Sequence, residues 1–200
     1  MTNKIIEFWF DFASTYSYLT AERIEAMAES NGLVIAWKPF LLGPIFKSNG
    51  LVGSPFTSNK PKRDYMWRDI QRSAKIYKIP FISSTVKMPQ NSLLAARVAL
   101  CLDDGAQRAA FTRQVYRAQF AHGKDIAELA TLADILANLG HQAAEILVQT
   151  QAAEIKQQLF ANTADAQTKG IFGAPSVITQ DGELFWGNDR LEDAMAWAVK

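Results

Sequence analysis

Residues 8–17, FWFDFASTYS, place two serines and a threonine where an apolar run gives way to a helical pattern. Backbone N–H groups in the first turn of a helix lack partners within the helix, so this end attracts anions. A serine hydroxyl at that point can donate one more hydrogen bond. Ser14 is therefore placed to hold a thiolate, which would lower the pKa of the thiol. The alternative is plain helix capping by Ser14 or Thr15, which these letters alone favour.

Other kinds of serine or metal chemistry have little support in the sequence. His122 and His141 are the only histidines, and both lie between helical patterns without a motif that pairs them with Ser14. We interpret both as surface residues. No cluster of His, Asp and Glu has the spacing of metal ligands, and the single cysteine, Cys101, excludes an intrachain disulfide. Because Cys101 lies in an apolar helical run, we expect a buried thiol.

A second informative stretch is GIFGAPSVI, residues 170–178. Pro175 opens an apolar run that predicts a buried strand, although a proline costs a central strand one hydrogen-bond donor. A cis peptide bond before Pro175 would explain the position, because it presents the backbone of Ala174 to a ligand. A simple turn from loop to strand is the alternative.

The patterns at the two ends of the chain predict the elements that position these residues. Residues 14–31 have the apolar periodicity of one helix, and the strands on either side of it should be parallel. Near the C-terminus, Asp181-Gly182 between apolar runs predicts a hairpin, and a last helix is expected from Asn188. The predicted strands are 4–10, 33–40, 175–179 and 183–186.

The long middle of the chain, residues 41–169, has a different character. Its first part, 41–63, is rich in Gly, Pro, Ser and Asn, which predicts loop or short helices broken by turns. Further on, Asp125 and Glu128 form a capping box that marks the start of a helix. We therefore predict one α/β domain, made of 1–40 and 170–200, with a loop plus all-helical insertion at 41–169. The predicted helices of the insertion are 64–78, 91–104, 107–120, 125–139 and 143–169.

Composition limits the possible functions. Of the 200 residues 48% are hydrophobic and 20% charged, as in soluble globular proteins. The net charge of +1 does not indicate the excess of basic residues typical of nucleic-acid-binding proteins, although residues 59–68 could form a local basic patch. No apolar stretch approaches the roughly 18 residues that span a bilayer, so we expect no membrane insertion. The N-terminus does not resemble a secretory signal, and the lone cysteine agrees with a cytoplasmic location.

The two ends together resemble the thioredoxin fold of DsbA-type thiol oxidases and kappa-class glutathione transferases. Within that group the chain is similar to the 2-hydroxychromene-2-carboxylate isomerase family over nearly its whole length. The family has a proline where this chain has Thr15. Redox relatives carry Cys-x-x-Cys where this chain has Ser14 and Ser17, which removes dithiol–disulfide exchange. The segments that carry the resemblance are FDFASTYSYL, LLGPIFK, KRDYMWRD, PQNSLLAARVA, GIFGAPSV and FWGNDRLED.

The resemblance implies that glutathione brings the missing thiol as a cofactor. Ser14 would hydrogen-bond its sulfur, and Ala174 before Pro175 would offer backbone bonds to its cysteinyl part. Asn188 and Asp189 match the family's pair for the γ-glutamyl group, with helix capping as a compatible alternative. The predicted glutathione-binding set is Ser14, Thr15, Tyr16, Lys62, Ala174, Pro175, Asn188 and Asp189. A loop asparagine of the family is matched by Asn49, Thr57 or Asn59.

The same resemblance implies a reaction. A glutathione-dependent isomerase would convert 2-hydroxychromene-2-carboxylate, or a similar intermediate of aromatic catabolism, to trans-o-hydroxybenzylidenepyruvate by transient thiolate addition. Phe46, Tyr65 and Trp67 are expected to form an apolar wall for the small aromatic substrate, with core packing as the alternative for each. A homodimer is also implied. Two further interpretations stay open: a kappa-class-like glutathione transferase or peroxidase, and a non-catalytic thioredoxin-like binding protein.

Overall fold

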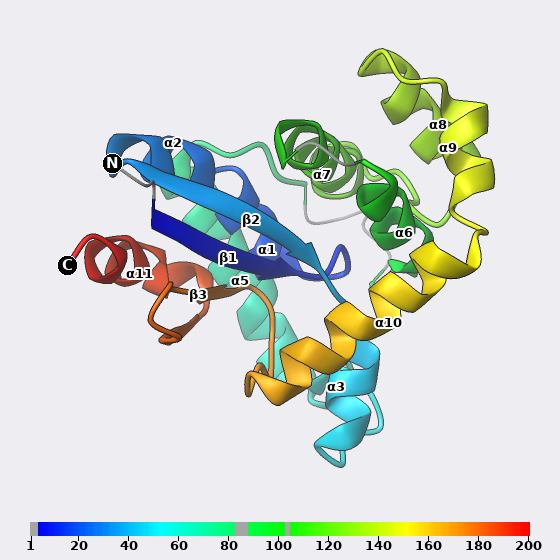
Figure 1. Ribbon diagram of the computed structural model, residues 1–200. Helices are drawn as coiled ribbons and strands as arrows, with labels where there is room; N and C mark the ends of the chain where they lie inside the picture. Colours follow the sequence, from blue (N-terminus) through cyan, green and yellow to red (C-terminus); the bar gives the residue numbers. More distant parts are fainter. Residues whose placement is uncertain (1–3, 83–87, 103–104) are drawn as a thin grey trace.

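A four-stranded sheet assembled from both ends of the chain lies at the centre of the molecule (Figure 1). The computed structural model describes residues 4–82, 88–102 and 105–200. The strand order is β2-β1-β3-β4, in which β1 runs parallel to β2 and antiparallel to β3, and β3 pairs with β4 antiparallel. The predicted sheet is thus confirmed. The strands are β1 (Lys4–Phe10), β2 (Leu33–Pro39), β3 (Ser176–Ile178) and β4 (Leu184–Trp186).

The middle of the chain is helical, and Figure 1 shows α8 and α9 as the helices farthest from the strands. The segment 41–63 holds two short helices, as predicted. The next helix begins at Lys60 rather than Asp64, because the side chain of Asn59 accepts the N–H of Lys62 and caps it. The helices are α3 (Leu42–Ser48), α4 (Pro55–Ser58), α5 (Lys60–Tyr77), α6 (Leu93–Cys101), α7 (Gly105–Phe120), α8 (Leu129–Asn138), α9 (Ala143–Gln149) and α10 (Ala153–Thr168).

The segment between β1 and β2 contains two helices, so the prediction of one helix over 14–31 is wrong. α1 (Thr15–Ala21) and α2 (Ile24–Ser30) are separated at Glu22 and Arg23. Both side chains at the break have partners in other elements. The carboxylate of Glu22 accepts two hydrogen bonds from α7, and the guanidinium of Arg23 donates to the segment before the last helix. These tertiary contacts outweigh the helical periodicity of the segment.

The capping box predicted at Asp125 and Glu128 does not form. The carboxylate of Asp125 accepts the N–H of Ala127 at 2.9 Å in a local turn, and Glu128 makes no side-chain capping bond. The helix α8 therefore begins at Leu129, four residues later than predicted. A short-range bond that the aspartate forms with its own turn competes here with capping.

The helix predicted over 143–169 is also interrupted, at residues 150–152 between α9 and α10. Thr150 is buried there, and its hydroxyl donates to the carbonyl of Leu147 at 2.6 Å. A hydroxyl that bonds the backbone in this way commonly bends or ends a helix. The break lets α10 run back toward the sheet from the distant α8 and α9, as Figure 1 shows.

Two apolar clusters cover the two faces of the sheet. On one face Phe8 and Phe10 pack with side chains from α1 and α7, and on the other Trp9 packs with Phe40 and Ile178. The first cluster includes residues from both parts of the predicted division, 1–40 with 170–200 and 41–169, and that division stays a prediction. The largest fully buried side chains of the first cluster are Phe8, Phe10, Phe12, Tyr18, Phe111, Tyr116 and Phe120.

The C-terminal part follows the prediction closely. β3 and β4 form the predicted hairpin, whose turn uses Gly182 at a positive φ that glycine adopts without strain. A 3₁₀ turn, η1 (Asn188–Arg190), then leads into α11 (Leu191–Ala198). The start of β1 and the end of α11 lie at the same end of the sheet (Figure 1). The turn after β1, which carries Ser14, is consequently at the opposite end. Within the described ranges, no helix is both long and apolar enough to cross a membrane.

Candidate functional site

Ser14 lies where the start of α1 meets the loop before β3. It is the N-cap of α1, and its Oγ accepts the N–H of Ser17 at 3.2 Å, so the predicted capping role is confirmed. The same hydroxyl donates to the carbonyl of Ala174 at 2.9 Å, across 160 positions of sequence. The Ser14 side chain is buried at this junction, with 8% of the residue exposed. One hydroxyl therefore joins the two segments that the sequence singled out.

Three backbone N–H groups are adjacent in sequence to this hydroxyl or belong to the residue that accepts from it. In the described part of the chain, no acceptor is recorded for the N–H groups of Thr15 and Tyr16, the first two residues of α1. The N–H of Ala174, beside the acceptor of the Ser14 hydroxyl, likewise has no recorded partner there. Backbone donors left without a protein acceptor beside a buried hydroxyl suit an anion or a peptide carbonyl. Since α1 has only seven residues, these local donors, and not a long helix dipole, define the site.

The loop before β3 has the cis peptide bond that Pro175 suggested. The Ala174–Pro175 bond is cis, and the carbonyl of Pro175 accepts the N–H of Gly187 at 3.0 Å. Gly173 is packed so tightly that a Cβ there would lie 2.4 Å from the indole nitrogen of Trp186. The loop is thus held from both sides, and it fixes the backbone of Ala174 against Ser14.

Thr15 and Tyr16 direct their side chains toward α5. The Thr15 hydroxyl lies 3.7 Å from the sulfur of Met66, and the Tyr16 hydroxyl donates to the carboxylate of Asp69 at 2.9 Å. Burial, reinforced by the neighbouring Asp69 carboxylate, raises the pKa of the Tyr16 hydroxyl above its ordinary value. It stays protonated and holds α1 to α5. Only the backbone of these two residues faces the site.

Asn188 and Asp189 have opposite environments. Asn188 is buried, and its amide oxygen accepts hydrogen bonds from Arg23 at 2.9 Å and from Thr20 at 3.4 Å. Its side chain therefore links η1 to the helices after β1. Asp189 is exposed, and its carboxylate lies 3.4 Å from the guanidinium of Arg190, a contact that solvent screens. Of the pair, Asp189 is the residue that offers a charge to a ligand.

Lys62 lies in the first turn of α5, one helical turn before Met66, which contacts Thr15. Its side chain is exposed, and its Nζ is 5.9 Å from the centre of the Phe56 ring. Among the candidates for the family asparagine, the Asn59 side chain is occupied in capping α5. Asn49 ends α3, and the side chain of Thr57 lies outside the described residues.

The structure does not bring the predicted aromatic wall together as one surface. Tyr65 is 62% exposed and carries the guanidinium of Arg72 over its ring at 5.5 Å. Trp67, two positions along the same helix, packs against Phe81 and the main apolar cluster. Phe46 is half-buried on α3. Packing therefore accounts for Trp67, and Tyr65 faces a different side of α5.

Asp11 is a buried carboxylate beside Ser14 that sequence reasoning missed. It accepts the N–H of Leu42 at 2.7 Å and that of Ala13 at 2.8 Å, and its own carbonyl accepts the N–H of Ser14 at 2.9 Å. Burial raises the pKa of Asp11, although these N–H groups and the hydroxyl of Ser92 oppose the shift. Asp11 joins the turn after β1 to the start of α3. A charged residue that ends an apolar strand was the available signal.

The remaining candidates stay apart from the site. His122 is exposed and His141 is half-buried, and no hydrogen bond recorded for the described residues joins either to Ser14. Cys101 is buried, as predicted. Over the ranges that the structure describes, no three His, Cys, Asp or Glu side chains gather as metal ligands.

The chain is similar to known proteins over nearly all of its length. A family model described as a DSBA-like thioredoxin domain matches residues 5–196. The 2-hydroxychromene-2-carboxylate isomerase of Pseudomonas putida is 30% identical over 191 residues, which cover 94% of this chain and 90% of that protein. Glutathione S-transferase kappa 2 of Caenorhabditis elegans is 28% identical over 204 residues, covering 94% and 88%. A solved 2-hydroxychromene-2-carboxylate isomerase matches with a TM-score of 0.87 and 29% identity, covering 96% and 95% of the two chains.

Proposed function

The chain belongs to the DSBA-like thioredoxin family, and from this premise we propose that it is a glutathione-dependent isomerase. Its reaction would convert 2-hydroxychromene-2-carboxylate, or a similar intermediate of aromatic catabolism, to trans-o-hydroxybenzylidenepyruvate. The observation that carries the proposal is the Ser14 hydroxyl held against Ala174, next to N–H groups that have no acceptor among the described residues. Similarity to isomerases at 28–30% identity supports the reaction class. Glutathione, when bound, would supply a thiolate that adds to the substrate and is later released unchanged.

The donors around Ser14 fit a thiolate. The Ser14 hydroxyl now donates to the carbonyl of Ala174, and a thiolate within reach is a stronger, charged acceptor for the same proton. The N–H groups of Thr15 and Tyr16, which follow Ser14 in the chain and have no acceptor among the described residues, would add two more donors. Each donor that bonds the anion and not the thiol lowers the thiol pKa. The residues of this chain would thus keep the sulfur ionised at neutral pH.

The spacing of the site fits a tripeptide. Thr20, which contacts Asn188, lies six residues after Ser14, or roughly 9 Å along the helix axis. Two extended residues span about 7 Å, and a γ-linked glutamyl residue reaches farther. Asp189 would accept the α-ammonium of that residue, while the backbone of Ala174 bonds the cysteinyl part. Lys62, on the α5 side of Thr15, would meet a carboxylate of the ligand.

A second activity is favoured by the relatives. Glutathione S-transferase kappa 2 of C. elegans matches this chain almost as well as the isomerases do. A transferase would use the same thiolate and the same Ser14, but it would consume glutathione. The two activities therefore differ in stoichiometry and not in the geometry of the thiol site.

The test is a turnover assay with 2-hydroxychromene-2-carboxylate in which free glutathione is counted at the end. The isomerase predicts product formation that requires glutathione and leaves its concentration unchanged. Glutathione lost one-for-one with product contradicts the isomerase and supports a transferase. If calorimetry detects no glutathione binding, both enzyme proposals fail and a non-catalytic binding protein is favoured.

Assembly and location belong to the same proposal. We propose a homodimer and a cytoplasmic location, in which the reduced glutathione pool is available. Light scattering on the purified chain tests the first, with a mass of one 22.2 kDa chain as the contradicting result. Fractionation of the source cells tests the second.

A further inference from the structure

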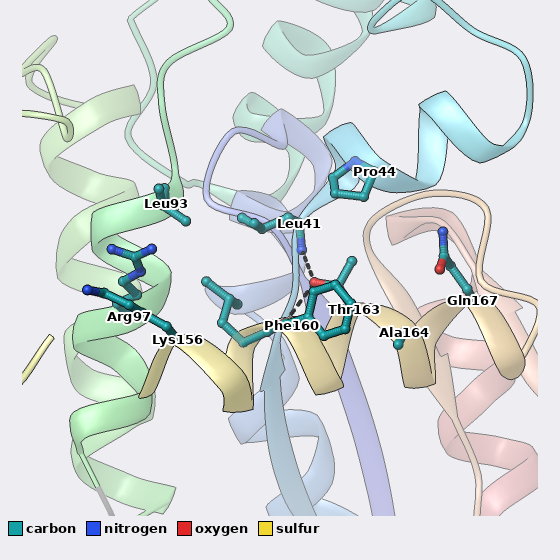
Figure 2. Close-up of a pocket in the computed structure, with 10 residues that line it drawn as sticks. Leu41, Pro44, Leu93, Arg97, Lys156, Phe160, Thr163, Ala164 and Gln167 are labelled. Carbon is teal, nitrogen blue, oxygen red and sulfur yellow. Dashed lines mark hydrogen bonds between the residues drawn. The ribbon is translucent and has the colours of Figure 1, made fainter. Parts of the chain in front are cut away.

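A cavity of about 250 Å³ lies between the start of α3, α6 and α10 (Figure 2). It shares no lining residue with the Ser14 site. Six apolar side chains form most of its wall, and among them Phe160 leaves 78% of its surface exposed. An apolar lining of this kind favours the flat or aliphatic body of a small ligand. The apolar lining residues are Leu41, Pro44, Leu93, Leu159, Phe160 and Ala164.

Two cations stand at one end of this cavity, Arg97 from α6 and Lys156 from α10 (Figure 2). The Nε of Arg97 is buried and has no hydrogen-bond partner in the part of the chain that the structure describes. Among residues 4–82, 88–102 and 105–200, no carboxylate forms an ion pair with either side chain. A buried donor without an acceptor costs free energy, and such groups call for an explanation. An anion placed between the two cations would supply the missing acceptor and balance their charge.

The other polar groups of the wall are already satisfied. The hydroxyl of Thr163 accepts the N–H of Leu41 at 3.2 Å and donates to the carbonyl of Leu159 at 2.9 Å. The amide of Gln167 donates to the hydroxyl of Ser48 at 3.1 Å. The polar groups of the cavity that still lack a partner among the described residues are therefore the cations Arg97 and Lys156, and both lie at one end. That asymmetry defines a ligand with one negative end and an apolar body.

We propose that this cavity binds a small aromatic carboxylate. Its carboxylate lies between Arg97 and Lys156, and its ring lies along Leu41, Leu93 and Phe160. A planar guanidinium matches two carboxylate oxygens, whereas the ammonium of Lys156 adds a point charge. The volume is slightly below the range of drug-sized pockets, which limits the ligand to one or two fused rings. The proposal does not rest on the thiol site or on its reaction.

Calorimetry of the full chain with 1-naphthoate tests this site, with neutral 1-naphthalenemethanol as the matched probe. Saturable binding of the carboxylate and at least tenfold weaker binding of the alcohol are expected. Lys156→Gln, at an exposed position, should weaken naphthoate binding several-fold, and Arg97→Gln should weaken it about tenfold. Lys75→Gln, an exposed charge on α5, is the control and should change nothing.

Three results would overturn the proposal. The first is an absence of saturable naphthoate binding to the wild-type chain. The second is equal affinity for the neutral alcohol, which reduces the cavity to an apolar surface. The third is binding that survives both Lys156→Gln and Arg97→Gln, which places the probe elsewhere. Ser14→Ala should leave naphthoate affinity unchanged, so the outcome is separable from the fate of the thiol site.

Discussion

The Ser14 site and the cavity between α6 and α10 both offer hydrogen-bond donors to a ligand, but they do so by different means. At Ser14 the donors are one hydroxyl and several backbone N–H groups, fixed by two segments that meet across 160 positions. In the cavity they are two charged side chains, Arg97 and Lys156, beside apolar walls. The donors at Ser14 are uncharged and held in fixed positions, so they suit a reacting atom. The cavity recognises charge and shape, which suits binding.

The largest expected effect separates the two regions. Ser14→Ala removes the hydroxyl that would bond the thiolate, and loss of one such donor lowers turnover about 100-fold or more. The same change removes the cap of α1 and costs about 1 kcal/mol of stability. Turnover with saturating glutathione and thermal unfolding measure the two losses separately. Full activity of this variant would remove Ser14 from the mechanism.

The next effect concerns Asp11, which supports the geometry of the Ser14 turn and has no counterpart in the cavity. The Asp11 carboxylate accepts the N–H groups of Leu42 and Ala13. Asp11→Asn replaces one of its two carboxylate oxygens by an NH₂ group, which should lower the free energy of unfolding by about 1–3 kcal/mol. Because burial raises the pKa of Asp11 in the folded state, the folded protein binds more protons than the unfolded chain between the two pKa values. The stability that Asp11 contributes is therefore fully present below its unfolded pKa and falls as the pH rises through the folded value.

Denaturant unfolding of wild type and Asp11→Asn, compared at about pH 4 and pH 7, checks that sign. The wild type should gain stability relative to the variant as the pH falls. The opposite slope would show that Asp11 is better stabilised as an anion than its burial indicates.

A smaller effect tests whether charge contributes to the Ser14 site at its far end. Asp189→Asn keeps the shape and removes the exposed carboxylate, so the KM for glutathione should rise about tenfold while kcat changes little. Asp193→Asn, an exposed acid on α11 that pairs with Arg190, is the matched control. An equal effect of both substitutions would reduce Asp189 to one of several general surface charges.

The smallest effect sharpens the role of the backbone donors. Thr15→Pro removes one N–H at a helix position that tolerates proline, and Ser14 already has an extended conformation compatible with it. The apparent pKa in the pH–rate profile should rise by up to about one unit. Thr15→Val keeps the N–H and loses only the hydroxyl contact with Met66, so its profile should not move. A shift in the valine variant would assign the effect to the side chain.

Much of the fold could be predicted from particular residues. Strand composition located the sheet, Asp-Gly located the hairpin, and Pro175 indicated the cis bond beside the site. The break of the first helix could not be predicted, because Glu22 and Arg23 keep the helical pattern and are diverted by partners distant in sequence. Hydrophobic periodicity indicates which face of a helix is apolar, but it does not indicate which polar side chains of other elements that helix will contact.

The same limit explains which features of the two sites could not be predicted. Asp11 ends an apolar strand, but nothing local indicates that its acceptors serve the start of α3. Arg97 and Lys156 lie in unrelated helices, and each alone resembles an ordinary surface charge. Asn188 and Asp189 are adjacent, yet burial divides their roles, since one is bonded to Arg23 and the other faces solvent. Each of these facts depends on packing between segments.

The most direct test of the central claim is the ionisation of glutathione bound to the protein. Thiolate absorbance in the ultraviolet, followed against pH for wild type and Ser14→Ala, reports the thiol pKa at the site. We predict a pKa well below that of free glutathione in the wild type and a return toward the free value in the variant. A bound thiol that ionises like free glutathione, or one that ionises equally in both proteins, would contradict the account.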